Sequence, residues 1–288
     1  ALLPLIGLTG ILFFDVATFI LAIGALMIVH IPQPPRTVEG EQGKGSIWKE
    51  AAYGFKYIFA RPSLLGLQLT FFFGNLFAGI AMTLLAPMIL SRTANDSLML
   101  GSVQTAGAVG GLIGGIAMSA WGGFKRRVHG VLIGWIISGI GMSIVGLEGG
   151  LPIWIIGSIL TAIVISLVNG SNQAIWQSKV APDVQGRVFS ARRLIAWLTN
   201  PISPIIAGTL ADFVLEPQMR VSTSALSQTF GWLVGTGPGA GMGLIIFFCG
   251  LSGPLIGLAG YLSTYIRDAE TLLPDHDQLA KVDAAPAD

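Results

Sequence analysis

The sequence predicts an all-α membrane protein with seven transmembrane helices, and three observations lead to this fold class. The chain has 288 residues and a mean hydropathy of +0.73, but only 11% of its residues are charged, whereas soluble domains carry roughly 25%. Seven apolar stretches reach the length of about 20 residues that a spanning helix needs. The basic residues gather in alternate breaks between these stretches. Because so little charge could not cover a soluble surface, lipid is expected to cover it.

The seven stretches follow one another along almost the whole chain. They do not alternate between polar and apolar residues, as membrane strands of about ten residues do, so each is expected to be a helix. They cover approximately residues 8–30, 64–90, 98–124, 128–148, 152–176, 194–215 and 239–266.

The break after the first stretch is the longest one on the basic side. Its first part is rich in Pro, Gly and charge, which is typical of a linker. Residues 46–62, "SIWKEAAYGFKYIFARP", then carry apolar residues at helical spacing, with Ser46 as an N-cap and Pro62 marking the end. This pattern predicts an amphipathic helix on the inner membrane surface. The alternative is a continuous extension of the second span.

The distribution of basic residues predicts the orientation of the spans. Arg92 and Arg220 stand in breaks on one side, and by the positive-inside rule the opposite, basic side is cytoplasmic. The C-terminus is then cytoplasmic, and the protein is a multi-pass protein of the inner, or cytoplasmic, membrane. The other fourteen of the sixteen basic residues lie on the basic side: Arg36, Lys44, Lys49, Lys56, Arg61, Lys125, Arg126, Arg127, Lys179, Arg187, Arg192, Arg193, Arg267 and Lys281.

Two spans carry residues that alter helix geometry or packing. The third span has glycines four residues apart in two registers, one with Gly107, Gly111 and Gly115 and the other with Gly110 and Gly114. Small residues at this spacing favour close packing of membrane helices. The sixth span contains Pro201 and Pro204, which are expected to kink it because each proline removes a backbone donor and clashes one turn back.

Several motifs together resemble the major facilitator superfamily, in particular its drug:proton antiporter branch, which includes macrolide-efflux-type proteins. They are "GGFKRR" at 122–127, "VAPDVQGRVFSARR" at 180–193, "IAGTLAD" at 206–212, "LEPQM" at 215–219, "GTGPGAG" at 235–241 and "LLPDHD" at 272–277. The resemblance implies twelve helices in two pseudo-symmetric halves, with substrate bound between them near the midplane.

The same resemblance implies a domain organisation for this chain. Residues 1–30 would be the last helix of the N-terminal half, and residues 31–62 a cytoplasmic linker with the amphipathic helix. Residues 63–266 would form the complete C-terminal six-helix bundle, and residues 267–288 a cytoplasmic tail. The chain opens directly into apolar sequence without an initiator Met, so we expect a missing N-terminal half of the same transporter as its partner.

The cytoplasmic gate motif of the family is incomplete here. The family carries an acid between the glycine of this motif and its basic cluster, but Ala120 and Trp121 stand near that position. Arg187 then needs another partner, and Asp183, one turn earlier, is a candidate. The residues carried over as gate or loop candidates are Gly115, Lys125, Arg126, Arg127, Asp183, Gly186 and Arg187.

Polar residues inside the spans are candidates for a substrate cavity, because polar groups that face lipid are costly. Gln68, Asn75 and Met82 fall seven residues apart on one helix face, and Gln104 lies in the third span. Hydrogen bonding between helices is the alternative role for them. A further polar stripe, at Asn169, Asn172, Gln173 and Trp176, fits an inner gate or an interfacial belt, and we favour the belt.

Asp15 is the candidate for proton coupling. It lies in the first span, about a turn and a half from its outer start, or roughly 8–10 Å deep at 1.5 Å per residue. A carboxylate there should point into protein, where burial raises the pKa toward the working range of a proton carrier. The alternative is a structural acid held ionised near the positive end of its helix.

The sequence gives no indication of an enzyme, a cofactor or a metal site. "GEQGKGS" lacks the spacing of a phosphate-binding loop, and "GTGPGAG" fails the dinucleotide pattern at Ala240. The single Cys249 and three scattered histidines do not predict a metal site, and a net charge of +1 does not favour nucleic acid.

Together, these patterns predict a secondary active exporter of lipophilic or amphipathic small molecules, such as a drug, a natural product or a siderophore. Transport would be coupled to protons by alternating access, and the partners would be the lipid bilayer, the substrate and protons. Two alternatives remain: a lipid or lysophospholipid flippase, and a membrane scaffold without a transport cycle.

Overall fold

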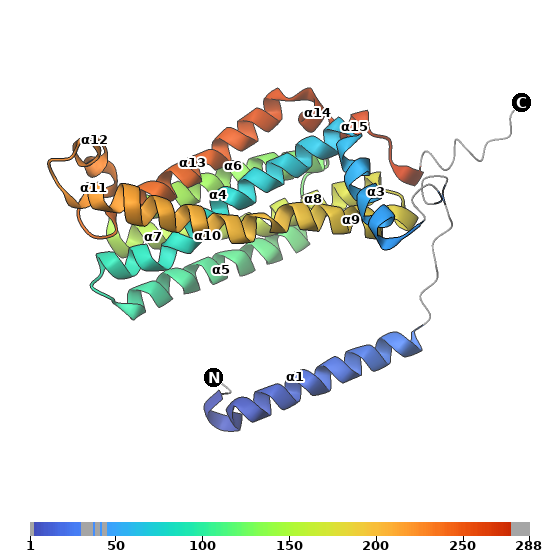
Figure 1. Cartoon of the computed structure of the whole chain (residues 1–288), viewed down its shortest axis with the longest axis horizontal. Helices are drawn as coiled ribbons and strands as arrows, with labels where there is room; N and C mark the ends of the chain where they lie inside the picture. The colour runs from blue at the N-terminus through green and yellow to red at the C-terminus, as the bar shows by residue number, and fades with distance from the viewer. Residues whose placement is uncertain (1–2, 30–36, 38–40, 42–44, 278–288) are drawn as a thin grey trace, which may run out of the picture. The chain divides into compact units, whose positions relative to one another are not determined.

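The computed structural model describes residues 3–29, 37, 41 and 45–277, and every regular element among them is a helix (Figure 1). The chain divides into two units, Ala1–Thr37 and Val38–Asp288, and each is described by itself. Most of residues 31–44, the first part of the linker predicted at 31–62, and residues 278–288, the end of the predicted tail, lie outside the described residues.

The first unit contains one helix, α1 (Leu3–Ile28). Its backbone departs from helical geometry at Gly7, where φ is +63° and ψ is 178°, a conformation that glycine adopts without steric cost. From Thr9 to Ile28 the helix is long and apolar enough to cross a membrane. Asp15 lies in this stretch between Phe14 and Val16.

The second unit contains six further candidate spans. Two of them are interrupted: the fifth span of the chain at Val164, and the sixth at Leu198 and again by a π-helical turn. In chain order the spans are α4 (Pro62–Arg92); α5 (Ser97–Trp121); α6 (Arg127–Gly146); α7 (Gly150–Ile163) with α8 (Ile165–Lys179); α9 (Pro182–Trp197) with α10 (Thr199–Leu210), η1 (Ala211–Leu215) and α11 (Glu216–Arg220); and α13 (Ala240–Leu262).

These spans confirm the predicted all-helical chain with seven candidate membrane helices. The sixth is longer than predicted, running from Pro182 to Arg220, because the polar segment before residue 194 continues the helix instead of forming a loop. Hydropathy marks only the apolar part of such a helix, so its polar extension was missed. The assignment of the helices to two bundles remains a prediction.

Glycines allow the helices of the second unit to approach backbone to backbone. A Cβ at Gly139 would lie 2.5 Å from the Gly250 carbonyl oxygen of α13, and one at Gly110 would lie 2.8 Å from that of Ile159 in α7. At Gly114 a Cβ would overlap the carbonyl oxygen of Ile163. At Gly111 nothing lies within 4 Å. Only the register of Gly110 and Gly114 therefore packs against the backbone of α7.

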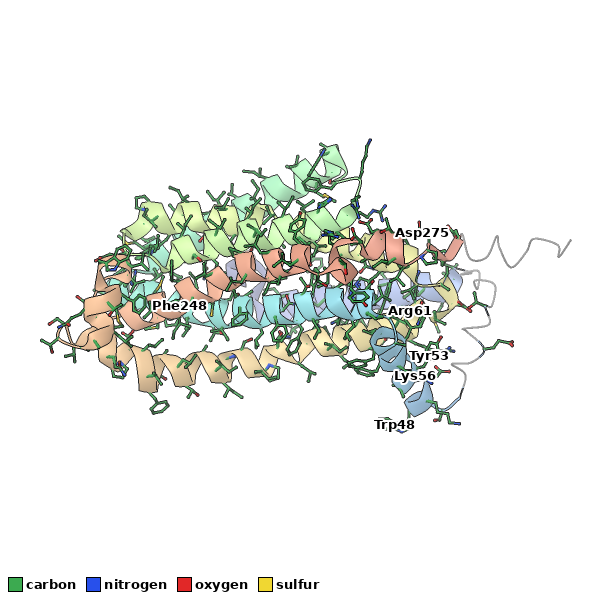
Figure 2. The ribbon with its side chains drawn as sticks, turned by 90° about the horizontal axis from the view of Figure 1, so that it is seen from above. Trp48, Tyr53, Lys56, Arg61, Phe248 and Asp275 are labelled. Atoms are coloured by element: carbon green, nitrogen blue, oxygen red, sulfur yellow. The ribbon has the colours of Figure 1, made fainter. Side chains whose placement is uncertain are left out.

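Short helices define two ends of the second unit (Figure 1). We call one the α3 end. It holds α3 (Ile47–Phe59), α14 (Thr264–Arg267) and α15 (Ala269–Leu272), together with the starts of α4, α6 and α9. The opposite end, the α12 end, holds α11 and α12 (Ala225–Val234). Figure 2 shows Tyr53, Lys56 and Arg61 at the α3 end and Phe248 toward the other.

The helix α3 is separate from α4 and packs against α9. Arg61 is extended, with φ −118° and ψ 98°, and Pro62 opens α4, so the alternative of a continuous extension of the second span is wrong. Gly54 brings α3 so close that an added Cβ would overlap the backbone of Arg187. Trp48 is 84% exposed at the far end of α3 (Figure 2). Its position on a membrane surface remains a prediction.

Candidate functional site

A pocket of about 250 Å³ opens among α4, α8 and α9, toward the α3 end of the second unit. The three helices supply amide, aromatic and cationic side chains to it. The lining residues are Gln68, Phe71, Asn75, Asn169, Asn172, Gln173, Phe189, Arg192, Arg193 and Ala196.

Hydrogen bonds between helices fix the walls of this pocket. Gln68 Nε2 donates to the carbonyl oxygen of Arg192 at 3.2 Å, which joins α4 to α9. Arg192 Nη1 donates to Gln173 Oε1 at 3.0 Å, which joins α9 to α8. Gln68 is only 2% exposed, and a buried amide needs such a partner. The three helices are therefore held together by the same side chains that line the pocket.

Aromatic rings support the Arg192 guanidinium. Its central carbon lies 5.1 Å from the centre of the Trp176 ring and 5.8 Å from that of Phe189, within the range of cation–π attraction. Trp176 is fully buried, and its Nε1 donates to Asn172 Oδ1 at 3.1 Å. Arg192 is thus held in place by rings and neutral amides.

The predicted cavity residues divide into two groups. Gln68 and Asn75 line the pocket, whereas Met82 and Gln104 are exposed and lie outside it. Gln68 also makes the interhelical hydrogen bond that was the alternative role for it.

The polar stripe of α8 faces the pocket. Asn169, Asn172 and Gln173 are among the lining residues. The interpretation of the stripe as an interfacial belt is wrong, because the fully buried Trp176 cannot reach a lipid–water interface. Sequence alone could not separate the two possibilities, since both need polar groups near a helix end.

The candidate gate residues stand at the α3 end but do not form one cluster. Arg126 Nη2 lies 3.0 Å from Asp268 Oδ1, and Arg187 Nη2 lies 3.5 Å from Glu50 Oε1 on α3. Asp183 is in the first turn of α9, where an acid is favourable. The pairing of Arg187 with Asp183 remains a prediction. Of the other candidates, Lys125 and Arg127 are exposed. A Cβ added at Gly186 would have no neighbour within 4 Å, and one added at Gly115 would lie 3.7 Å from Ser166 Oγ.

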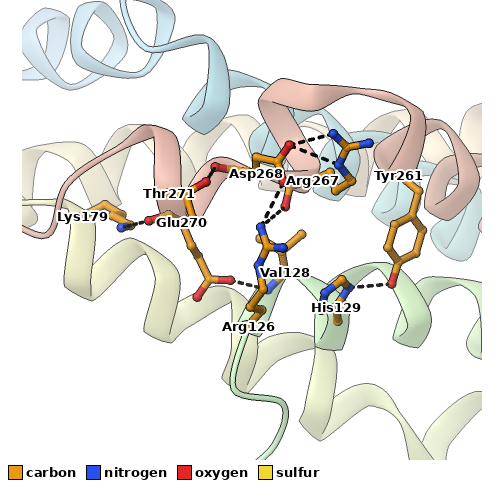
Figure 3. Close-up of polar contacts among 9 residues, drawn as sticks. All are labelled: Arg126, Val128, His129, Lys179, Tyr261, Arg267, Asp268, Glu270 and Thr271. Carbon is orange, nitrogen blue, oxygen red and sulfur yellow. Dashed lines mark hydrogen bonds and ion pairs between the residues drawn. The ribbon is translucent and has the colours of Figure 1, made fainter.

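The C-terminal segment is attached to the bundle by a network that we call the C-terminal clasp, formed by residues 264–277 with Arg126, Val128 and Lys179 (Figure 3). Lys179 has a buried ammonium group that donates to the carbonyl oxygens of Glu270 and Leu273 and pairs with Asp275 at 2.8 Å. Glu270 Oε2 accepts from the backbone N–H of Val128 at 3.0 Å, at the start of α6. The clasp therefore joins α6, α8 and the C-terminal segment.

Charge pairing inside the clasp shifts two pKa values. The hydrogen bond from Arg267 holds the pKa of Asp268 below its ordinary value, and the hydrogen bond from Arg126 acts in the same direction. The same contact with Asp268 raises the pKa of Arg267. The charged forms of these groups are thus favoured.

Arg92 and Glu216 hold the α12 end together. The Arg92 guanidinium donates to the carbonyl oxygens of Gly239, Leu147 and Val234 at 3.3, 3.1 and 2.8 Å. Glu216, only 7% exposed, accepts from backbone N–H groups at the start of α13. The positive end of a helix stabilises a carboxylate in this position.

The sixth span is interrupted where its prolines act. Residue 197 is four residues before Pro201, and α9 ends there, at Trp197. Proline clashes with the carbonyl at this position. Pro204 lies inside α10.

Sequence reasoning missed the most connected charged residues of the second unit: Arg92, Lys179, Glu216, Asp268 and Glu270. Each stands in or next to a break, where charge is ordinarily solvated, so no local signal separates them from surface residues. Their partners come from segments up to 147 residues away in the sequence.

The fold and the pocket together define a multi-pass membrane protein with a polar cavity among its helices, and comparison with known proteins supports a transporter. The chain is 26% identical over 210 residues to macrolide efflux protein A of Streptococcus pyogenes and 26% over 200 residues to macrolide efflux protein A of Enterococcus faecalis. It is 24% identical over 194 residues to the multidrug efflux pump Tap of Mycolicibacterium fortuitum. No family model and no solved structure matches the chain.

These matches confirm the resemblance that the motifs indicated. The chain is distantly homologous to drug efflux transporters of the major facilitator superfamily, which are transporters and not enzymes. The matches cover 71%, 68% and 67% of this chain and 51%, 60% and 46% of the respective relatives. The chain thus spans about half the length of the relatives that it matches.

Proposed function

We propose that this chain is the substrate-handling second half of a secondary active exporter of lipophilic or amphipathic small molecules. The observation that carries the proposal is the pocket among α4, α8 and α9, in a chain distantly homologous to efflux pumps. Seven of its ten lining residues are amides or arginines, and two aromatic rings stand beside them; convergent polar groups of this kind can orient a bound ligand. In this arrangement α1 is the last helix of the first half, and α4 to α13 form the second bundle.

The charge distribution supports an inward-opening pocket. Among the described residues, the basic side chains of the second unit lie at the α3 end, apart from Arg92 and Arg220 at the α12 end. By the positive-inside rule, the α3 end and the C-terminus are then cytoplasmic. Reporters fused after residue 45 and near residue 225 should lie on opposite sides of the membrane. Finding both on one side would contradict this orientation.

The packing of the α12 end supports an exporter closed on its outer side. Arg92 ties α4 to the ends of α6 and α12, and Glu216 ties α11 to α13. Because these bonds close the α12 end while the pocket lies toward the α3 end, substrate would enter from the cytoplasm. A protease site inserted near Ser224 should be cut from outside. Resistance in intact cells with cleavage in inverted vesicles would contradict this arrangement.

Coupling to protons is proposed through Asp15 of α1. It is a carboxylate within a span whose neighbours are apolar, and such acids commonly serve ion or proton pathways. In the protein with both halves, D15N should abolish proton-driven efflux and keep substrate binding. Lower thermal stability with normal proton-coupled transport per folded molecule would instead make Asp15 structural.

The function itself is tested in inverted membrane vesicles with an imposed pH gradient. Macrolides and other amphipathic compounds are offered as labelled candidates, and gradient-dependent accumulation is expected for at least one. Movement of labelled lysophospholipid instead would favour a flippase. If no candidate accumulates although the protein is folded and inserted, a scaffold without a transport cycle becomes the better account.

A further inference from the structure

The charge of the pocket is one-sided. Arg192 and Arg193 line it, and none of its lining residues is an Asp or a Glu. Among the described residues no carboxylate lies within 4 Å of the Arg192 guanidinium, whose hydrogen bond goes to the neutral amide oxygen of Gln173. A partly buried charge is costly unless a counter-charge or several hydrogen bonds compensate it. Within the part of the chain that the structure describes, the Arg192 charge is therefore compensated by a neutral amide and aromatic rings alone.

We propose that the pocket binds the acidic group of an amphipathic organic anion, with the Arg192 guanidinium as its counter-ion. This inference rests on the proposed transport function and names the class of substrate for it. The acidic group is a carboxylate, sulfonate or phosphate, and it occupies the space between Arg192, Arg193 and the amides of α8.

The geometry of Arg192 suits this role. A guanidinium carries five N–H donors in a planar fork, and only Nη1 donates to a described protein atom. The remaining donors can form the paired bonds that a planar or tetrahedral anion accepts. The bond to Gln173 and the rings of Trp176 and Phe189 hold the fork in place, so little freedom is lost on binding.

The rest of the pocket fits the neighbouring part of such a molecule. Phe71 and Phe189 supply apolar walls, and Asn75 and Asn169 supply amide groups that bond polar substituents. At about 250 Å³ the pocket is below the roughly 300–1,000 Å³ of a cavity that encloses a drug-sized ligand. It therefore takes the acidic headgroup and the adjoining ring or chain, and the remainder of the amphipath extends out of the opening.

The binding test compares two probes of nearly equal shape and opposite charge. The full chain is placed in nanodiscs of phosphatidylcholine, and equilibrium binding of radiolabelled 1-naphthaleneacetic acid and 1-naphthalenemethylamine is measured against empty nanodiscs. Saturable binding of the acid and none of the amine is expected. Equal binding of both probes, or no saturable binding of the acid, would overturn the inference.

Variants then assign the binding to the arginine. R192Q should weaken the affinity for the acid at least about tenfold, or about 1.4 kcal/mol, because it removes the charge-assisted hydrogen bonds of the guanidinium. R192K keeps the charge without the fork and should fall between. R193Q, which changes an exposed side chain, should weaken binding severalfold even if R192Q fails to fold. The matched control R220Q removes an exposed arginine at the α12 end, outside the pocket, and should leave the affinity for the acid unchanged.

Two sources of the acidic group are separated by competition. If lysophosphatidylglycerol displaces the naphthaleneacetic acid and lysophosphatidylcholine does not, the ligand is an anionic lipid headgroup. If neither displaces it, the ligand is a free organic acid. Unchanged affinity in folded R192Q and R193Q proteins would refute the site.

The outcome is separable from that of the proposed function. Gradient-driven export of a cationic compound without binding of the acid would overturn this inference and leave the exporter intact. Binding of the acid with no gradient-driven movement of any candidate would support this site and overturn the exporter.

Discussion

Glu216 offers the sharpest test of how the α12 end is held closed. Its carboxylate accepts three backbone N–H bonds at the start of α13: Oε1 from Gly239 at 2.6 Å, and Oε2 from Gly241 at 3.0 Å and Met242 at 3.3 Å. The side chain is 9% exposed, so water cannot replace these bonds. The substitution E216Q keeps the shape but turns one oxygen into an amide donor.

The expected cost of E216Q follows from these contacts. Whichever oxygen is replaced, the new NH₂ group faces at least one N–H donor that loses its acceptor. A hydrogen bond to a charged group is worth about 1.5–3 kcal/mol, and the loss of charge at a helix N-terminus adds up to about 2 kcal/mol in a partly buried site. We expect the free energy of unfolding to fall by about 3 kcal/mol.

The matched control is R220Q, which removes the other partner of Glu216. Arg220 Nε lies 3.3 Å from Glu216 Oε1, but its side chain is 56% exposed, so the pair should contribute at most about 1 kcal/mol. The free energy of unfolding is measured by titration with sodium dodecyl sulfate in mixed micelles, followed by circular dichroism. An E216Q protein within about 0.5 kcal/mol of the wild type, or equal effects of E216Q and R220Q, would refute the reasoning.

Three further predictions concern the C-terminal clasp and the packing of α5. The substitution K179M leaves two carbonyl acceptors and an acid without their buried partner. Limited proteolysis should therefore remove the C-terminal segment at least about tenfold faster than in the wild type. An unchanged rate would contradict the clasp. The pKa of Asp268 in the folded protein is depressed below its ordinary value of 3.8. The stabilisation that Asp268 gives the clasp is therefore fully present above pH 3.8 and is lost as the pH falls through the lower, folded-state pKa. Protection of the segment should therefore persist at pH 5 and fail only in stronger acid, while D268N should lack this pH-dependent step; a loss of protection between pH 7 and pH 5 would exclude Asp268 as its cause. The substitution G114V forces a side chain into the carbonyl of Ile163 and should lower the free energy of unfolding by about 1–3 kcal/mol or more. The control G111V, on the open face of α5, should lower it much less. Equal costs in the same titration would show that α5 does not pack on α7 through Gly110 and Gly114.

The pocket was only partly predictable from its residues. Gln68 and Asn75 fall on one helix face, and that face does line the cavity. Met82 continues the same face but lies beyond the pocket, because the spacing along one helix does not say how far the neighbouring helices stay apart. The interfacial belt was predicted for α8 for the same reason, since a buried and an interfacial polar stripe have the same sequence pattern.

The number, type and approximate bounds of the membrane helices could be predicted from the amino-acid sequence alone. Crossing a bilayer depends on the length and polarity of one continuous segment, and both are properties of the linear chain. The partners of the charged groups, in contrast, depend on how the helices pack in three dimensions. Arg92 bonds three carbonyl oxygens from three different segments, and Lys179 bonds the carbonyls of a segment about 90 residues away. Backbone carbonyl and N–H groups are present at every residue, so no sequence pattern marks the ones that the fold brings to a charge.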